Sequence, residues 1–265
     1  LWAFEANQHT GAYAPDAAVR NGARKFVLIS TDKAVNPSSV MGTTKRVAEK
    51  IVLGWPRFAT SSTDFRAVRF GNVLGSDGSV IPLFKRQLAK GGPLTVTHPE
   101  VRRYFMSIRE AVELVLQASA LPDAAGRILM LEMGEPVRIA DLADQLIRLS
   151  GLQPGKDVQV TFTGLRPGEK LDEELVTSRE SHVATDVRKV HLVQTPLGLS
   201  EELEERVLAL LRAARWSEPA QVLRALRRLV PEFTPTPNNE VPQRTRRRRP
   251  DRARPSRVAA DADRA

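Results

Sequence analysis

The order of apolar and polar positions predicts alternating strands and helices. Residues 26–29 form a short apolar run, F-V-L-I, which is typical of a buried parallel strand. Apolar residues then recur at helical spacing over 40–52. Ser38 or Ser39 is placed to cap this helix, and Gly54 and Pro56 are placed to end it.

The same reading predicts further elements along the chain. Strands are expected at 65–70, 94–97, 127–133 and 158–162, and helices at 108–121 and 139–149, the second closed by Gly151. The strand at 65–70 is expected to alternate between apolar and polar residues. Two apolar stripes in 200–230 predict helices with a packing or partner surface. This alternation indicates an α/β protein.

Composition narrows the class of protein. A chain of 265 residues forms one large or two modest domains, and its apolar and charged fractions are those of a soluble globular protein. It has no run of eighteen apolar residues and no secretory signal pattern, so the expected location is cytoplasmic. The absence of cysteine excludes disulfides and thiolate metal sites, and the four histidines show no metal-ligand spacing, so no metal is expected.

Polar residues follow the first predicted strand at once: Ser30, Thr31, Asp32 and Lys33. The carboxyl ends of parallel strands are where open α/β sheets place their chemistry. The chain has nine lysines against thirty-one arginines, yet lysine stands at 33 and again at 45, and lysine suits proton transfer better than arginine. The alternative is that both lysines are solvated surface groups and Met41 fills the core.

Several motifs together carry a resemblance to a known family. They are S-T-D-K-A-V-N-P at 30–37, M-G-T-T-K-R at 41–46, R-F-G-N-V-L-G at 69–75, G-S-V-I-P at 78–82, R-Y-F-M at 103–106 and R-P-G-E-K at 166–170. In this order they resemble the CapD-like polysaccharide-biosynthesis proteins, which are nucleotide-sugar 4,6-dehydratases of the extended short-chain dehydrogenase/reductase superfamily. The resemblance covers roughly residues 24 to 234.

The resemblance implies a fold and a division into domains. It implies the C-terminal part of a Rossmann-type parallel sheet, a smaller α/β substrate-binding domain and a C-terminal helical region. The expected divisions are a partial dinucleotide-binding domain with the catalytic strand and helix at 1–75, and a nucleotide-sugar region interleaved with Rossmann elements at 76–199. C-terminal helices follow at 200–234, and a disordered basic tail at 235–265.

The resemblance also implies catalytic roles for UDP-N-acetylhexosamine 4,6-dehydration through a 4-keto intermediate. Lys33 would take the C5 proton and Asp32 would protonate the departing C6 hydroxyl. Met41 stands where most of the superfamily has a catalytic tyrosine, so Thr31, with help from Asp32, becomes the acceptor of the C4 hydroxyl proton. Ser30 and Lys45 would bind the cofactor, NAD(P).

The substrate-binding residues implied by the resemblance are Asn72, Ser79, Val80, Pro82, Arg103, Arg166 and Glu169. Each has an ordinary structural alternative. Asn72 could be a turn residue before Gly75, and 79–82 could be a plain helix start. Arg103 could lie on a solvated face, and the Pro-Gly turn beside Arg166 and Glu169 could hold a local ion pair.

The beginning of the chain departs from the family pattern. No glycine-rich phosphate loop precedes the catalytic strand, and residues 8–16 fit a loop because of Gly11 and Pro15. The chain is therefore expected to be truncated and inactive alone, with longer relatives that carry a membrane anchor in a preceding region. The alternatives are a non-catalytic nucleotide-sugar-binding remnant and a UDP-sugar epimerase.

The resemblance and the basic tail predict what the chain binds. The expected ligand is a UDP-sugar, and a homo-oligomer is compatible with the family. From residue 235 onward the chain carries nine arginines against four acidic residues. Such a tail could touch nucleic acid or an anionic membrane, making the chain an interaction protein, but a solubilising role is the commoner one for this composition.

Overall fold

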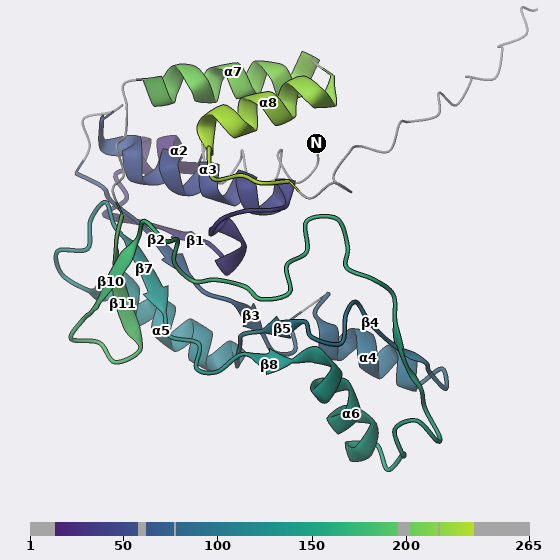
Figure 1. Ribbon diagram of the computed structural model, residues 1–265. Coiled ribbons are helices and arrows are strands. Elements are labelled where there is room, and N and C mark those ends of the chain that lie inside the picture. The colour runs from purple at the N-terminus through teal and green to yellow at the C-terminus, as the bar shows by residue number, and fades with distance from the viewer. Residues whose placement is uncertain (1–13, 58–61, 77, 196–201, 217, 236–265) are drawn as a thin grey trace, which may run out of the picture.

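A five-stranded sheet lies at the centre of the molecule (Figure 1). The computed structural model describes residues 14–57, 62–76, 78–195, 202–216 and 218–235. The strand order is β1 (Lys25–Ile29), β2 (Asp64–Arg69), β7 (Ile128–Leu131), β11 (Val190–Gln194) and β10 (Ser181–Ala184). The first three strands are parallel, and β11 and β10 add antiparallel pairs. The parallel strands end together, which creates one edge for a site.

Helices cover both faces of this sheet. Helix α3 (Val40–Gly54) lies on one face and α5 (Ile108–Ala120) on the other (Figure 1). Ala48 and Val52 of α3 pack into a buried cluster with Phe65, while Ala118 of α5 packs with Val68. Helices α7 (Glu202–Trp216) and α8 (Pro219–Leu229) cover the outer side of α3. The predicted packing role of the 200–230 helices is thus confirmed.

A smaller lobe extends from the sheet beside the carboxyl ends of its strands (Figure 1). It contains α4 (Val80–Leu88), β4 (Leu94–Val96), α6 (Ile139–Leu149) and β9 (Val160–Phe162), around a core of its own that includes Phe84, Leu94 and Ile147. Three short strand pairs build this lobe and its junction: β3 (Asn72–Val73) with β6 (Phe105–Met106), β5 (Arg102–Arg103) with β8 (Val137–Arg138), and β4 with β9.

The α/β class expected from the sequence is confirmed. Helix α3 is capped by Ser39, whose side chain accepts a hydrogen bond from the Gly42 backbone, and it ends at Gly54. Helix α6 has the predicted bounds, and the parallel pairing of β1 with β2 agrees with the buried strand expected at 26–29. These elements were predictable because apolar spacing and capping residues agree there.

Two expectations need correction, and one pair of strands was not predicted. Pro15 and Asp16 lie in helix α2 (Ala14–Arg20) instead of a loop, since proline is tolerated in the first helical turn. Strand β2 does not alternate: Arg66 and Arg69 are both fully buried because each guanidinium finds acceptors inside the fold. The sequence also gave no sign of the β10 and β11 pair, whose strands carry several exposed residues.

The remaining expectations concern the two ends of the chain and membrane-spanning helices. The predicted basic tail at 235–265 lies almost wholly outside the described residues, as do residues 1–13. Within the portion of the chain that the structure describes, no helix has both the length and the apolar character needed to cross a membrane.

Candidate active site

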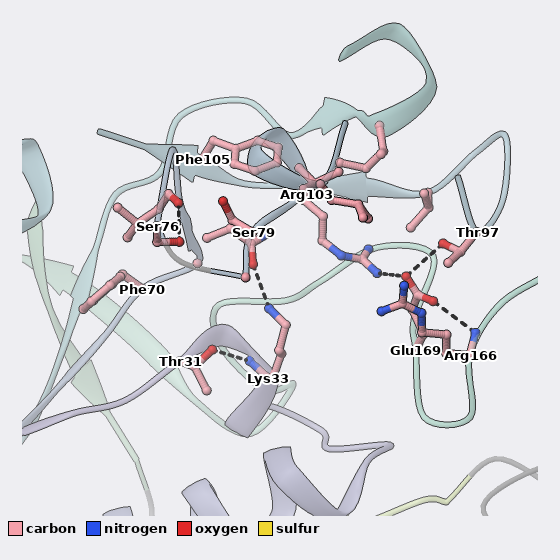
Figure 2. Close-up of a pocket in the computed structure, with 18 of the residues that line it drawn as sticks. Thr31, Lys33, Phe70, Ser76, Ser79, Thr97, Arg103, Phe105, Arg166 and Glu169 are labelled. Carbon is pink, nitrogen blue, oxygen red and sulfur yellow. Dashed lines mark hydrogen bonds and ion pairs between the residues drawn. The ribbon is translucent and has the colours of Figure 1, made fainter. Parts of the chain in front are cut away.

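A cavity of about 610 Å³ lies between the carboxyl ends of β1 and β2 and the smaller lobe. Figure 2 shows side chains from both parts pointing into it. Its lining includes many of the residues singled out from the sequence: Ser30, Thr31, Lys33, Asn72, Ser79, Val80, Arg103, Arg166 and Glu169. Segments far apart in the chain therefore meet around a single volume.

Thr31, Asp32 and Lys33 form a connected group at the sheet end of the cavity. The Thr31 hydroxyl donates to Asp32 Oδ1 at 2.8 Å, and Lys33 Nζ donates to the same oxygen at 3.0 Å. They lie at the start of η2 (Asp32–Ala34), a short 3₁₀ turn that Thr31 caps (Figure 2). The turn immediately after β1 thus places a hydroxyl and an amine on one carboxylate.

Asp32 is fully buried and is reached from the cavity through its two neighbours. Its second oxygen, Oδ2, has no hydrogen-bond partner among the described residues. A Cβ built on Gly71 would come within 3.1 Å of that oxygen, so a larger residue at this position would crowd the Asp32 carboxyl. An unpaired buried carboxylate oxygen is costly and therefore suggests a group kept for chemistry.

Lys33 is only partly exposed and is surrounded by acceptors. Besides Asp32, its amine donates to Asn72 Oδ1 at 3.1 Å and lies 4.0 Å from Glu173 Oε1. Asn72 belongs to strand β3 and is thus not the turn residue considered above. The reading of Lys33 as a solvated surface lysine is excluded by these contacts.

Met41, Lys45 and Ser30 lie around the same strand end with different surroundings. Met41 is exposed, while Lys45 Nζ donates to the Ile29 carbonyl at 3.3 Å. Burial lowers the pKa of Lys45, and the charge of Glu49 offsets this in part. Ser30 borders the cavity, yet its hydroxyl donates to buried Glu49 at 2.6 Å. Met41 is therefore not part of the hydrophobic core, and the Ser30 hydroxyl is engaged in a hydrogen bond inside the protein.

The far end of the cavity is basic. Arg103 is buried, and its guanidinium donates to Glu169 Oε1 at 3.1 Å and to the carbonyls of Lys170 and Leu171. Glu169 also accepts from the Thr97 hydroxyl and from the Arg166 backbone (Figure 2). The Arg166 side chain is exposed and has no partner among the described residues. Arg103 orders the loop and also borders the cavity, whereas the Arg166 side chain borders the cavity without a partner among the described residues.

Helix α4 contributes the remaining predicted residues. Ser79 precedes the helix, and its buried hydroxyl has no partner among the described residues, although it borders the cavity. Val80 also lines the cavity, whereas Pro82 lies in the first turn of the helix outside the lining. Asp32, Met41 and Lys45 likewise lie outside the lining. The segment is the start of a helix, as the structural alternative has it, and Ser79 and Val80 face the cavity as well, so its substrate-binding role stays a prediction.

Two residues of the site were missed by sequence reasoning. Thr97 orients Glu169, and it directly follows strand β4, where a threonine is unremarkable. Glu173 is buried beside Lys33 and Arg103. It sits within the acidic run Asp172, Glu173, Glu174, and sequence alone could not tell which of the three faces inward.

The family of the chain follows from comparison with known proteins. A family model described as polysaccharide biosynthesis protein matches residues 2–195. The chain belongs to this family. Its fold is the Rossmann type of nucleotide-sugar dehydratases and epimerases, as expected from the sequence motifs. The match takes in the strand, turn and helix around Lys33 and the loop that holds Glu169.

Individual relatives agree with the family. The chain is 53% identical over 193 residues to the capsular polysaccharide biosynthesis protein CapD of Staphylococcus aureus, covering 71% of this chain and 32% of that protein. It is 30% identical over 201 residues to a UDP-N-acetylglucosamine 4,6-dehydratase (inverting) of Campylobacter jejuni, covering 75% and 57%. The chain thus spans about a third of the length of the first of these relatives.

Solved structures show the same fold. The structure of Pen from Bacillus thuringiensis superposes with a TM-score of 0.63 at 30% sequence identity, covering 72% of this chain and 59% of that chain. A dTDP-glucose 4,6-dehydratase from Bacillus anthracis superposes with a TM-score of 0.52 at 16% identity, covering 61% and 57%. At that identity the second likeness concerns the fold alone.

Proposed function

We propose that this chain carries the substrate side of a nucleotide-sugar dehydratase that acts in polysaccharide biosynthesis, with a UDP-N-acetylhexosamine as substrate. The observation that carries the proposal is the layout of the cavity. An acid–base group, Thr31, Asp32 and Lys33, stands at one end, and two arginines, Arg103 and Arg166, stand at the other. A diphosphate suits planar guanidinium groups, and a hexose would then lie against the acid–base group.

The chemistry assigned to the chain's own residues is proton transfer. Thr31 accepts the proton of the C4 hydroxyl while its own hydroxyl proton passes along the 2.8 Å hydrogen bond to the Asp32 carboxylate. Once C4 is a ketone, Lys33 removes the acidified C5 proton and Asp32 supplies a proton to the C6 hydroxyl, which leaves as water. With the C4 proton on Asp32 and Lys33 as the neutral amine, the 3.0 Å contact between the two groups presents an acid and a base side by side.

The cofactor proposed for this reaction is NAD(P). Partly buried Lys45 and the exposed apolar side chains of Ile29 and Met41 border the carboxyl end of β1, and they fit a ribose and a flat nicotinamide ring. Lys45 would hold the ribose hydroxyls. When bound, this cofactor removes a hydride from the sugar and returns it. The dTDP-glucose 4,6-dehydratase from Bacillus anthracis is described in complex with NAD.

Epimerisation at C4 is the second candidate, supported by a relative named UDP-glucose 4-epimerase of Rickettsia rickettsii, 35% identical over 178 residues. A C4 epimerase needs an acid–base group at C4 only. The Asp32–Lys33 pair adds a separate base and acid, which elimination across C5 and C6 requires. This pair therefore favours dehydration.

Calorimetric titration with UDP-N-acetylglucosamine tests the proposal. We expect saturable binding that Arg166→Ala weakens about tenfold or more, because a charge-assisted contact to phosphate contributes about 1.5–3 kcal/mol. Arg109→Ala is the matched control, since Arg109 is an exposed arginine on α5 that pairs only with Glu113 among the described residues. Absence of binding, or equal losses in both variants, would contradict the proposal.

A further inference from the structure

Glu173 is a buried carboxyl that the proposed mechanism does not use. Its side chain is 5% exposed. Its Oε1 atom lies 4.0 Å from Lys33 Nζ and 3.9 Å from Arg103 Nε. The same oxygen thus stands between the amine at the acid–base end of the cavity and the guanidinium at the basic end.

The electrostatic surroundings of Glu173 are mixed. Burial raises its pKa above the usual range, and the charge of Asp32 acts in the same direction. The cations Lys33, Arg103 and Lys170 act against this rise. Lys33 and Asp32 face Glu173 from η2, Arg103 from β5 and Lys170 from the preceding loop. Its protonation therefore depends on how fully these cations are engaged elsewhere.

We propose that Glu173 is a positioning residue that links the diphosphate end of the cavity to the acid–base pair, and that it takes up a proton when a nucleotide sugar engages Arg103. This inference rests on the proposed function, because it assumes that the diphosphate reaches this arginine. It assigns Glu173 no contact with the reacting atoms. It gives a route by which substrate binding changes the charge beside Lys33.

Glu173 and an incoming diphosphate compete for the charge of Arg103. An incoming diphosphate brings negative charge to the guanidinium and cancels much of the stabilisation that Arg103 gives to an ionised Glu173. Burial and the Asp32 charge then favour the neutral carboxyl. Once Glu173 is neutral, Asp32 is the one carboxylate left beside the Lys33 amine among the described residues. The amine is then held less firmly as an ammonium and is better able to act as a base.

Proton counting by calorimetry tests this link. Wild-type protein is titrated with UDP-N-acetylglucosamine at about pH 6, above the ordinary glutamate pKa of about 4.3, in buffers of different ionisation enthalpy. A diphosphate diester has no titrating proton of its own in this range. We expect uptake of a fraction of a proton per nucleotide bound, lost in Glu173→Gln and kept in Asp172→Asn, an exposed carboxyl one residue away. Binding with no proton uptake in the wild type, or with unchanged uptake in Glu173→Gln, overturns the proposal.

A ligand-free measurement separates this proposal from the function on which it rests. The carboxyl carbon of Glu173 is followed by ¹³C NMR against pH and assigned by its loss in Glu173→Gln. We expect titration above the usual glutamate range, moving further upward in Arg103→Gln, while the Arg102→Gln control leaves it in place. If UDP-N-acetylglucosamine fails to bind, the proposed function fails. A Glu173 titration that does not respond to Arg103→Gln shows that the two groups are uncoupled and refutes the link.

Discussion

At the scale of single residues, Glu49 shows how the fold keeps a charge in its interior. Its carboxylate is fully buried and accepts hydrogen bonds from the Ser30 hydroxyl and from Arg46 and Arg69. Burial alone would raise the pKa of Glu49, but the charges of Arg69 and Arg46, with hydrogen bonds from Arg69 and Ser30, lower it to about 2. This carboxylate therefore fixes the strand end from which Thr31 and Lys33 emerge.

Replacing this carboxylate is predicted to destabilise the protein. Glu49→Gln leaves two buried guanidinium groups short of an anion, a change that typically costs about 3–5 kcal/mol. Because the pKa of Glu49 is lower in the folded state, its stabilisation is present above the unfolded value of about 4.3 and is lost as pH falls toward 2. Urea unfolding at several pH values measures this loss. The wild type should approach the variant in acid, and Glu113→Gln, at an exposed pair on α5, should behave like the wild type.

A difference between wild type and Glu49→Gln that stays constant from neutral pH to pH 2 would contradict this account. Such a result would mean that the pKa of Glu49 is the same in the folded and the unfolded protein.

At the scale of elements, helix α3 and the turn η2 touch through backbone atoms. A Cβ built on Gly42 would lie 2.0 Å from the Lys33 carbonyl oxygen, so no side chain fits there. On the other side, the Ser38 hydroxyl donates to the Gly168 carbonyl at 2.7 Å, and Lys170 Nζ donates to the Val35 carbonyl at 3.1 Å. The start of α3 thus contacts the acid–base turn, and the segment just before it is hydrogen-bonded to the loop that contains Gly168 and Lys170 at the basic end of the cavity.

The close approach at Gly42 predicts that alanine at this position lowers the stability of the protein, the reverse of its usual effect in a helix. Alanine normally stabilises a helix relative to glycine by about 1 kcal/mol. Here Gly42→Ala should destabilise the protein by about 1–3 kcal/mol, because the added methyl group forces α3 away from the Lys33 backbone. Met41→Ala, at the exposed neighbouring position, should change stability by no more than about 0.5 kcal/mol. Thermal unfolding compares the two, and a stabilised Gly42→Ala would refute the contact.

The predictability of the fold and site also differs between elements. Helices α3 and α6 were predictable because apolar spacing and end signals lie within a few residues of each other. The pair β10 and β11 was not, because β10 is exposed along its whole length, and because β11 takes its place by pairing with β7, which is distant in sequence. At the site, the turn 30–33 was visible as polar residues after a strand. The inward position of Glu173 was not, because it depends on Lys33 and Arg103, which are distant in sequence.

At the scale of the whole molecule, the sheet and the smaller lobe form two walls of one cavity. The sheet supplies the acid–base group after β1, and the smaller lobe supplies Arg103 from β5. Helices α7 and α8 pack on the outer side of α3, with Leu210 and Leu226 buried there, away from the cavity. In the proposed function, this arrangement orients an elongated ligand with its charged part toward the smaller lobe and its sugar toward the sheet.

A crystal structure of the chain with UDP-N-acetylglucosamine shows how the ligand lies in the cavity. We expect the diphosphate within hydrogen-bond distance of Arg103 or Arg166, and the C4 to C6 edge of the hexose facing the Thr31 hydroxyl and the Lys33 amine. A nucleotide bound outside this cavity, or one whose sugar lies at the Arg103 end with its phosphates beside Lys33, would contradict it.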